Sequence, residues 1–326
     1  MIQTATIPKQ LRSPIQAIEA GVARWPRVTL VYTALAILVV SAGVYSPRFR
    51  STDNVLNILQ ESILLSLVSI GQTLVVLAGG IDLSVGSLVK LSTLVAALLI
   101  NGHDGMIVPA LLICVGLGTV VGLGNGLVIT RMGVAPFVVT FAAFYILRGS
   151  AYALSTTPVG SAAPALDVFY NASVLGIPAV LLLWAFVWVV AWFALHFTAF
   201  GRHIYAIGGQ QTVARLAGIK VDRIKIAVYV LCSVLAALGG LYELTRITIG
   251  DPQVGEGLEL DSITAVAIGG TSLFGGRGYL VGTFGGVLLL GVINNMFNLL
   301  QVNSFYQDLV KGIMILIAVA VYREKR

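Results

Sequence analysis

The stretch Gly79–Ser87, GGIDLSVGS, holds the first side chains in the sequence that could do chemistry within a long apolar region. Its glycines, acid and serines break an apolar run, and a broken helix at membrane depth is tolerated only where protein buries it or water reaches it. Asp82 is the most intrusive charge, and an acid inside a membrane span indicates a functional site by default. The structural alternative is that Asp82 or Ser84 caps the helix that follows. Both interpretations stay open.

Further polar side chains interrupt the apolar runs downstream. Lys90 lies eight residues beyond Asp82, which is about 80° around a helix, so it could pair loosely with that acid, line a cavity or reach the aqueous face. The amides within spans could hydrogen-bond a solute hydroxyl in a pore or join helices to each other. The candidate translocation path comprises Asp82, Ser84, Lys90, Asn125, Asn294 and Asn295.

Signals of enzyme chemistry are missing. The sequence lacks the G-x-x-x-x-G-K-[ST] pattern of a nucleotide-binding loop and the G-x-S-x-G pattern of a nucleophile elbow. His103, His196 and His203 are scattered without metal-ligand spacing, and both cysteines lie in apolar runs. We therefore expect no catalytic residue, cofactor or metal. A membrane pathway without its own energy site needs a partner or an ion gradient.

The stretch Phe200–Lys225 is the longest polar, charge-bearing stretch between two apolar runs, and it is strongly basic. It contains a short helix signal over Gln210–Ala217, with glycines before it and Gly218 as a left-handed exit. Three apolar positions share one face of that helix by their spacing: Val213, Leu216 and Ala217. This pattern predicts a small apolar knob that a soluble partner could grip. A solvated loop with an incidental helical turn is the alternative.

Composition decides the class of the elements that position these residues. The chain has 326 residues, of which 57% are hydrophobic and only 10% charged, and its mean hydropathy is +0.94. About a quarter of the residues in a soluble chain are charged, so this chain cannot cover a globule with polar groups and must use lipid as solvent. The net charge of +6 does not require nucleic acid, because basic cytoplasmic loops give the same balance.

Apolar runs near the length of a membrane helix recur along the chain. The sequence predicts an all-α polytopic membrane protein with about ten transmembrane helices and two Gly-interrupted repeats. One transmembrane domain would occupy 28–322, with a cytoplasmic loop at 198–225 and cytoplasmic tails at 1–27 and 323–326. The predicted spans are 28–45, 62–79, 84–100, 107–129, 134–154, 178–197, 226–248, 262–274, 279–299 and 306–322.

The placement of Lys and Arg predicts the orientation. If both termini are cytoplasmic, most of the basic residues lie inside, including those of the loop 198–225. The predicted outer loop 249–261 carries four acids and no base, which agrees with this topology.

An internal repeat is visible at a shift of 190 residues, where Gly79 and Gly80 meet Gly269 and Gly270. Each glycine pair would lie between an inward-running and an outward-running span, so the repeat would be parallel. Transporters are commonly built from such duplicated halves.

Four motifs stand out when they are taken together: GGIDLSVGS; GRHIYAIGG (Gly201–Gly209) with Ala214 and Gly218-Ile behind it; ELDSITAVAIGGTSL (Glu259–Leu273); and NNMFNLL (Asn294–Leu300). Together they resemble the permease subunits of bacterial sugar ABC importers, most closely those of the ribose type. The resemblance runs from about residue 50 to the C-terminus.

The resemblance implies a translocation subunit in the bacterial inner membrane that pairs with a second permease copy or a sister permease. Its partners would be a cytoplasmic ATPase with two fused nucleotide-binding domains and a periplasmic sugar-binding protein. Lys90, Gln210 and Gln211 depart from what is common in the family at those positions. The implied ATPase-coupling helix comprises Gln210, Gln211, Thr212, Val213, Ala214, Arg215, Leu216, Ala217 and Gly218. The acids Asp251, Glu256 and Glu259 could form part of the dock for the binding protein.

A rival class is a secondary transporter of a small polar solute driven by H⁺ or Na⁺. Asp82 would then be the coupling carboxylate. Dependence of uptake on ATP hydrolysis rather than on an ion gradient separates the two classes.

Overall fold

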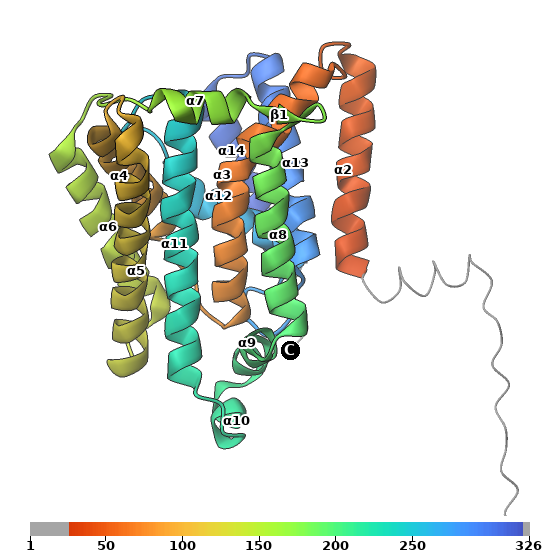
Figure 1. The fold of residues 1–326 in the computed structure, drawn as a ribbon. Helices are drawn as coiled ribbons and strands as arrows, with labels where there is room; N and C mark the ends of the chain where they lie inside the picture. The colour runs from red at the N-terminus through yellow and green to blue at the C-terminus, as the bar shows by residue number, and fades with distance from the viewer. Residues whose placement is uncertain (1–25, 322–326) are drawn as a thin grey trace, which may run out of the picture.

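The computed structural model describes residues 26–321. The terminal residues 1–25 and 322–326, which include nearly all of the predicted N-terminal tail and the whole C-terminal tail, lie outside the described part. Figure 1 shows a bundle of long helices with α7 (Pro164–Asn171) across one end and α10 (Gln211–Leu216) hanging from the other. We call these the α7 end and the α10 end.

Within residues 26–321 the regular secondary structure is helical apart from one small hairpin, β1 (Ser173–Val174) with β2 (Ile177–Pro178), at the α7 end. The long helices are α2 (Pro26–Tyr45), α3 (Thr52–Leu77), α5 (Ile107–Arg131), α6 (Pro136–Leu154), α8 (Ala179–Phe197), α11 (Val221–Ile247), α13 (Leu280–Leu299) and α14 (Ser304–Val321). Shorter helices are α4 (Val85–Ile100), the 3₁₀ turn η1 (Asp104–Met106), α9 (Ala199–Gly209) and α12 (Leu258–Ile268).

Seven helices in the described residues are long and apolar enough to cross a membrane: α2, α3, α5 with the turn before it, α6, α8, α11 and α13. This confirms the prediction of an all-α polytopic membrane protein. The other predicted spans correspond to α4 with 16 residues, α12 with 11 and α14 with 18. The predicted count of ten spans stays a prediction.

Two helices differ from the expected spans for local reasons. The span predicted at 62–79 begins at Thr52, because the Ser51 side chain caps the helix by accepting from the Asn54 amide. The span predicted at 262–274 begins at Leu258 and ends at Ile268, so its last residues form a loop instead. Gly270, at φ +86°, lies just beyond its end, in the left-handed region that glycine adopts without strain.

Helix α11 is central to the core and packs against α3, α4 and α5. A stripe of glycines at four-residue spacing lets α5 approach it closely. A Cβ at Gly118, Gly122 or Gly126 would lie within 2.5–2.8 Å of an α11 Cα atom. Small residues at this spacing are the usual means of close helix contact in lipid.

Two non-helical segments interrupt the bundle: 78–84, between α3 and α4, and 269–279, between α12 and α13. We call them the first and the second break, and the helices before them end in the same way. Gly79 and Gly80 donate to the carbonyls of Val76 and Val75, and Gly270 and Thr271 donate in the same pattern after α12. Gly79 therefore corresponds to Gly270 rather than to Gly269, one residue away from the alignment made on sequence. The duplication itself stays a prediction.

Candidate functional site

Three of the predicted path residues meet at the first break. Asp82 is fully buried, and its Oδ1 accepts from the Ser84 amide at 2.9 Å and from Ser84 Oγ at 2.5 Å. Asn125 of α5 donates to Ser84 Oγ at 3.1 Å. Ser84 immediately precedes α4, yet its side chain makes no capping bond. Asp82 therefore fixes the turn that leads into α4, as acidic residues do in Asx-turns. Its Oδ2 has no hydrogen-bond partner.

Asn295 lies elsewhere. Its side chain exchanges two hydrogen bonds with Asn54, at 2.9 and 3.1 Å, and so joins α13 to α3. Asn54 lies about 35 Å along α3 from Leu77, where the first break begins. The neighbouring Asn294 has a buried Oδ1 without a partner. The predicted path residues therefore fall into separate groups, and the Asn54–Asn295 pair joins helices, the alternative that the sequence left open.

Lys90 is buried in α4 and donates to the Tyr152 hydroxyl of α6 at 3.0 Å. Its ammonium also lies 4.6 Å from the centre of the Tyr152 ring. Gly86 is in the first turn of α4, and Lys90 follows it by one turn on the same helix face. Lys90 therefore joins α4 to α6, and it lies nearer the α7 end than the first break does.

The acidic segment 251–259 reaches into the bundle. A Cβ at Gly86 would lie 2.1 Å from Glu259 Oε2 and 2.5 Å from the Gly255 carbonyl, so both groups pack directly on the start of α4. Gly86 is about 21 Å along α4 from Ile100 at the α7 end. Gly250, by contrast, pairs with Val159 at that end. Of the three predicted dock acids, only Asp251 directly follows this pairing near the α7 end, whereas Glu259 packs on Gly86.

The short helix predicted over Gln210–Ala217 is present as α10, within one residue of the expected bounds. Its role in coupling stays a prediction. Val213 is 52% exposed and Leu216 84% exposed, and Ala217 is exposed as well. Ala214 points the other way and is buried with Ile207 and Val221. The predicted apolar knob thus exists. Gly218 leaves the helix at φ +82°, as expected.

Two side-chain contacts join α10 to the first turns of α11. Arg215 pairs with Asp222 at 2.8 Å, and Lys225 donates to Gln211 Oε1 at 2.8 Å. A groove of about 350 Å³ opens beside the helix, and its lining includes His203, Lys220 and Arg223. An apolar knob next to a basic groove offers both shape and charge to a partner.

Helix α9 was missed by sequence reasoning, which placed a flexible entry at Gly208–Gly209. Both glycines belong to the helix. A Cβ at Gly208 would lie 1.8 Å from the Leu77 carbonyl and 2.4 Å from the Gly276 amide. Gly276 in turn donates to the Leu77 carbonyl at 3.0 Å. Glycine at 208 thus permits α9 to touch both breaks at once. We call this contact of Gly208, Leu77 and Gly276 the glycine junction.

Tyr205 adds a hydrogen bond to the glycine junction. Its hydroxyl donates to the Gly278 carbonyl at 2.8 Å. Burial raises the pKa of Tyr205 to about 12, so the hydroxyl keeps its proton, and the bond persists, across the physiological pH range. Helix α9 therefore contacts α10 as well as both broken segments.

Comparison with known proteins gives one consistent result. The family model described as the branched-chain amino acid transport system permease component matches residues 54–319. The chain is 43% identical over 300 residues to the ribose import permease protein RbsC of Bacillus subtilis, covering 90% of this chain and 92% of the relative. It is 40% identical over 298 residues to RbsC of Escherichia coli K12, with the same coverage.

A third relative is the D-allose transport system permease protein AlsC of Escherichia coli K12, 35% identical over 292 residues, which are 89% of each chain. No solved structure matches. The match spans nearly all of the described helices, so the resemblance drawn from the motifs is confirmed. The chain therefore belongs to the family of branched-chain amino acid transport system permease components, as a multi-pass transport subunit of the bacterial inner membrane rather than an enzyme.

Proposed function

We propose that this chain forms the translocation pathway of an ATP-driven importer for a monosaccharide of the ribose type. The proposal rests on the way in which α10 is presented and supported. Helix α10 presents Val213 and Leu216 outward while Ala214 anchors it, and its supporting helix α9 touches both breaks through the glycine junction. A partner that grips α10 and moves can therefore change the broken segments, and the names of the relatives supply ribose and allose as the substrate class.

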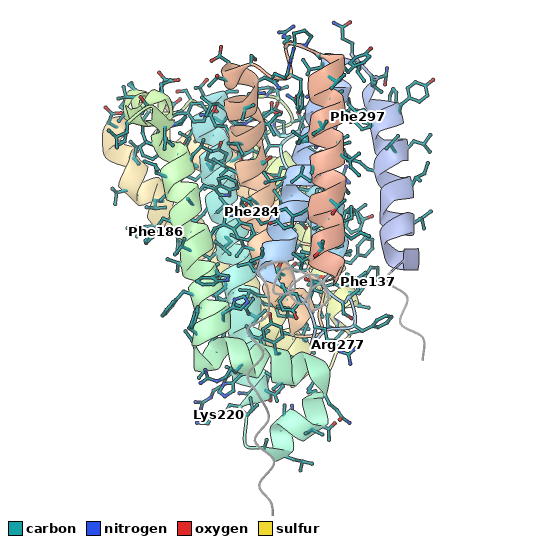
Figure 2. The ribbon with its side chains drawn as sticks, turned by 90° about the vertical axis from the view of Figure 1, so that its right-hand side faces the viewer. Phe137, Phe186, Lys220, Arg277, Phe284 and Phe297 are labelled. Atoms are coloured by element: carbon teal, nitrogen blue, oxygen red, sulfur yellow. The ribbon has the colours of Figure 1, made fainter. Side chains whose placement is uncertain are left out.

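The orientation follows from the basic residues. Figure 2 places Lys220 and Arg277 toward the same end of the bundle, and the basic residues of 198–225 gather there. By the positive-inside rule we assign the α10 end to the cytoplasm and the α7 end to the outer side. The even number of predicted spans then puts both termini in the cytoplasm.

The proposed partners are a cytoplasmic ATPase with two fused nucleotide-binding domains, a periplasmic sugar-binding protein and a second permease copy. The ATPase would receive Gln210–Gly218 in a cleft. ATP binding would close the ATPase and push α10, and the segments 78–84 and 269–279 would rock with it. Asp251, near the α7 end, is proposed as part of the dock for the binding protein. The path residues Asp82, Ser84 and Asn125 would shape the first break during this movement.

Leu216→Asp tests the coupling. Leu216 is 84% exposed, so a charge there should leave the fold intact while it opposes burial in an apolar cleft. We expect the variant to insert normally, to lose co-purification with the ATPase and to lose uptake. Leu175→Asp is the matched control, because Leu175 is 99% exposed at the opposite end. Normal uptake by Leu216→Asp would remove α10 from the mechanism.

A secondary transporter remains the second candidate, and the unpartnered Oδ2 of buried Asp82 is the observation that favours it. Such a carboxylate could bind a proton during transport. Uptake into vesicles that stops on addition of an uncoupler, with ATP still supplied, would support this candidate. Uptake that follows ATP hydrolysis and ignores the uncoupler supports the importer.

A further inference from the structure

A group of charged side chains lies in the middle of the bundle with its charges incompletely paired. Lys90 has no carboxylate within salt-bridge distance among the described residues, and Glu259 Oε2 is buried without a hydrogen-bond partner. Both groups lie along the first turns of α4, because Glu259 packs on Gly86 and Lys90 is one turn further on. A charge at this depth within a membrane protein is energetically costly. Where such a charge is kept, it usually serves a function.

Two more charges stand at the open side of this group. Arg148 of α6 lies 3.7 Å from Glu256, and their side chains are 40% and 57% exposed. The Arg148 guanidinium is also 5.7 Å from the Tyr152 ring that Lys90 contacts. The group therefore has two cations, two anions and a phenol, and its Arg148–Glu256 pair is partly exposed to the surroundings.

We propose that Lys90, Tyr152 and Glu259 form a station that binds neighbouring hydroxyls of a sugar as it crosses the membrane. We call it the Lys90 station. The inference rests on the proposed function and deepens it by naming the groups that contact the substrate. It also assigns Glu256 and Glu259 to the pathway rather than to the dock for the binding protein.

The chemistry of the Lys90 station suits a neutral polyol. The Lys90 ammonium has three donors and gives one to Tyr152, so two remain for a solute. Glu259 Oε2 is a free acceptor. Each hydroxyl of a sugar can both donate and accept, so adjacent hydroxyls can bridge the cation and the anion. The balanced charges disfavour an ionic solute, because either sign would meet one like charge.

The first test measures sugar moved per ATP hydrolysed in vesicles that contain the complete importer, with D-ribose as the probe. We expect Lys90→Met and Glu259→Ala to lower this ratio about tenfold or more, since each removes a charged hydrogen-bonding group. Glu259→Gln, which keeps an acceptor, should recover part of it. Lys311→Met is the matched control, because Lys311 of α14 pairs with Asp261 rather than with a residue of the Lys90 station. A fall in ATP hydrolysis that matches the fall in uptake would indicate a structural role and overturn the proposal.

The second test does not depend on the identity of the sugar. Lys90→Cys should react with a membrane-impermeant cationic thiol reagent in at least one nucleotide state of the importer, whereas the buried Cys114 and Cys232 should not. Absence of labelling in the nucleotide-free, ATP-bound and vanadate-trapped states would overturn the Lys90 station. If Lys90→Cys is labelled but the unaltered importer moves no ribose, the proposed substrate class fails and the aqueous position of the station stands.

Discussion

Ser66 is the point at which α8 is fastened to α3. The indole nitrogens of Trp184 and Trp188 both donate to Ser66 Oγ, at 2.6 and 2.5 Å. All three residues are buried. The same indoles pack on Phe284 of α13, one stacked at 5.5 Å and one edge-on at 5.0 Å between ring centres. Figure 2 places Phe284 within the bundle.

Ser66→Ala removes the shared acceptor and leaves two buried N–H donors unpaired. An interhelical hydrogen bond in a membrane protein is worth about 0.6 kcal/mol on average and up to about 1.7 kcal/mol, so the loss of two should lower the free energy of unfolding by about 1–3 kcal/mol. Reversible unfolding in mixed micelles, followed by tryptophan fluorescence, measures the change.

Ser69→Ala is the control, because Ser69 is equally buried on the same helix and its hydroxyl has no partner. That variant should leave the free energy of unfolding nearly unchanged. If Ser66→Ala costs no more than Ser69→Ala, the two indole bonds contribute nothing to stability and the reasoning is wrong.

Three further predictions follow from close contacts. Gly122→Val should prevent stable folding, because a Cβ there would lie 2.5 Å from the Val230 Cα. Gly124→Val is the control and should be tolerated, because a Cβ at Gly124 has no atom within 4 Å. The yield of monodisperse protein in detergent distinguishes the two, and equal yields would contradict the prediction. Gly208→Ala should disturb the glycine junction and reduce uptake per ATP, while Gly209→Ala should not; equal transport by both would contradict the junction. Asn54→Ala and Asn295→Ala should be non-additive in unfolding by about 0.6 kcal/mol or more, and additive values would mean that the amide pair is not coupled.

Local signals in the sequence predicted what depends on local structure. The bounds of α10 followed from apolar spacing and from Gly218, because a short helix ends where a left-handed residue is cheapest. The long apolar runs predicted the spanning helices, because lipid requires them wherever the chain crosses. The four-residue glycine spacing in α5 is a sequence signal from which its close contact with α11 can be predicted.

The depth of Glu259 could not be predicted in this way. Acids and glycines in 249–261 are typical of an exposed loop, and the evidence against that interpretation lies in Gly86, far away in the sequence. Only the absence of a side chain at Gly86 lets the carboxylate reach the start of α4. Helix α9 was missed for a related reason, because its glycine at 208 fits a contact with α3 and the loop after α12 that no local pattern reveals.

The side-chain contacts that fix α10 have a consequence for assembly. Because the Arg215–Asp222 and Lys225–Gln211 contacts already hold the helix in place, a protein that captures it has no disordered segment to freeze, and association should proceed close to rigid-body docking. For the proposed ATPase, α10 would therefore be a preformed docking element, and the movement that it imposes would be taken up in the segments 78–84 and 269–279.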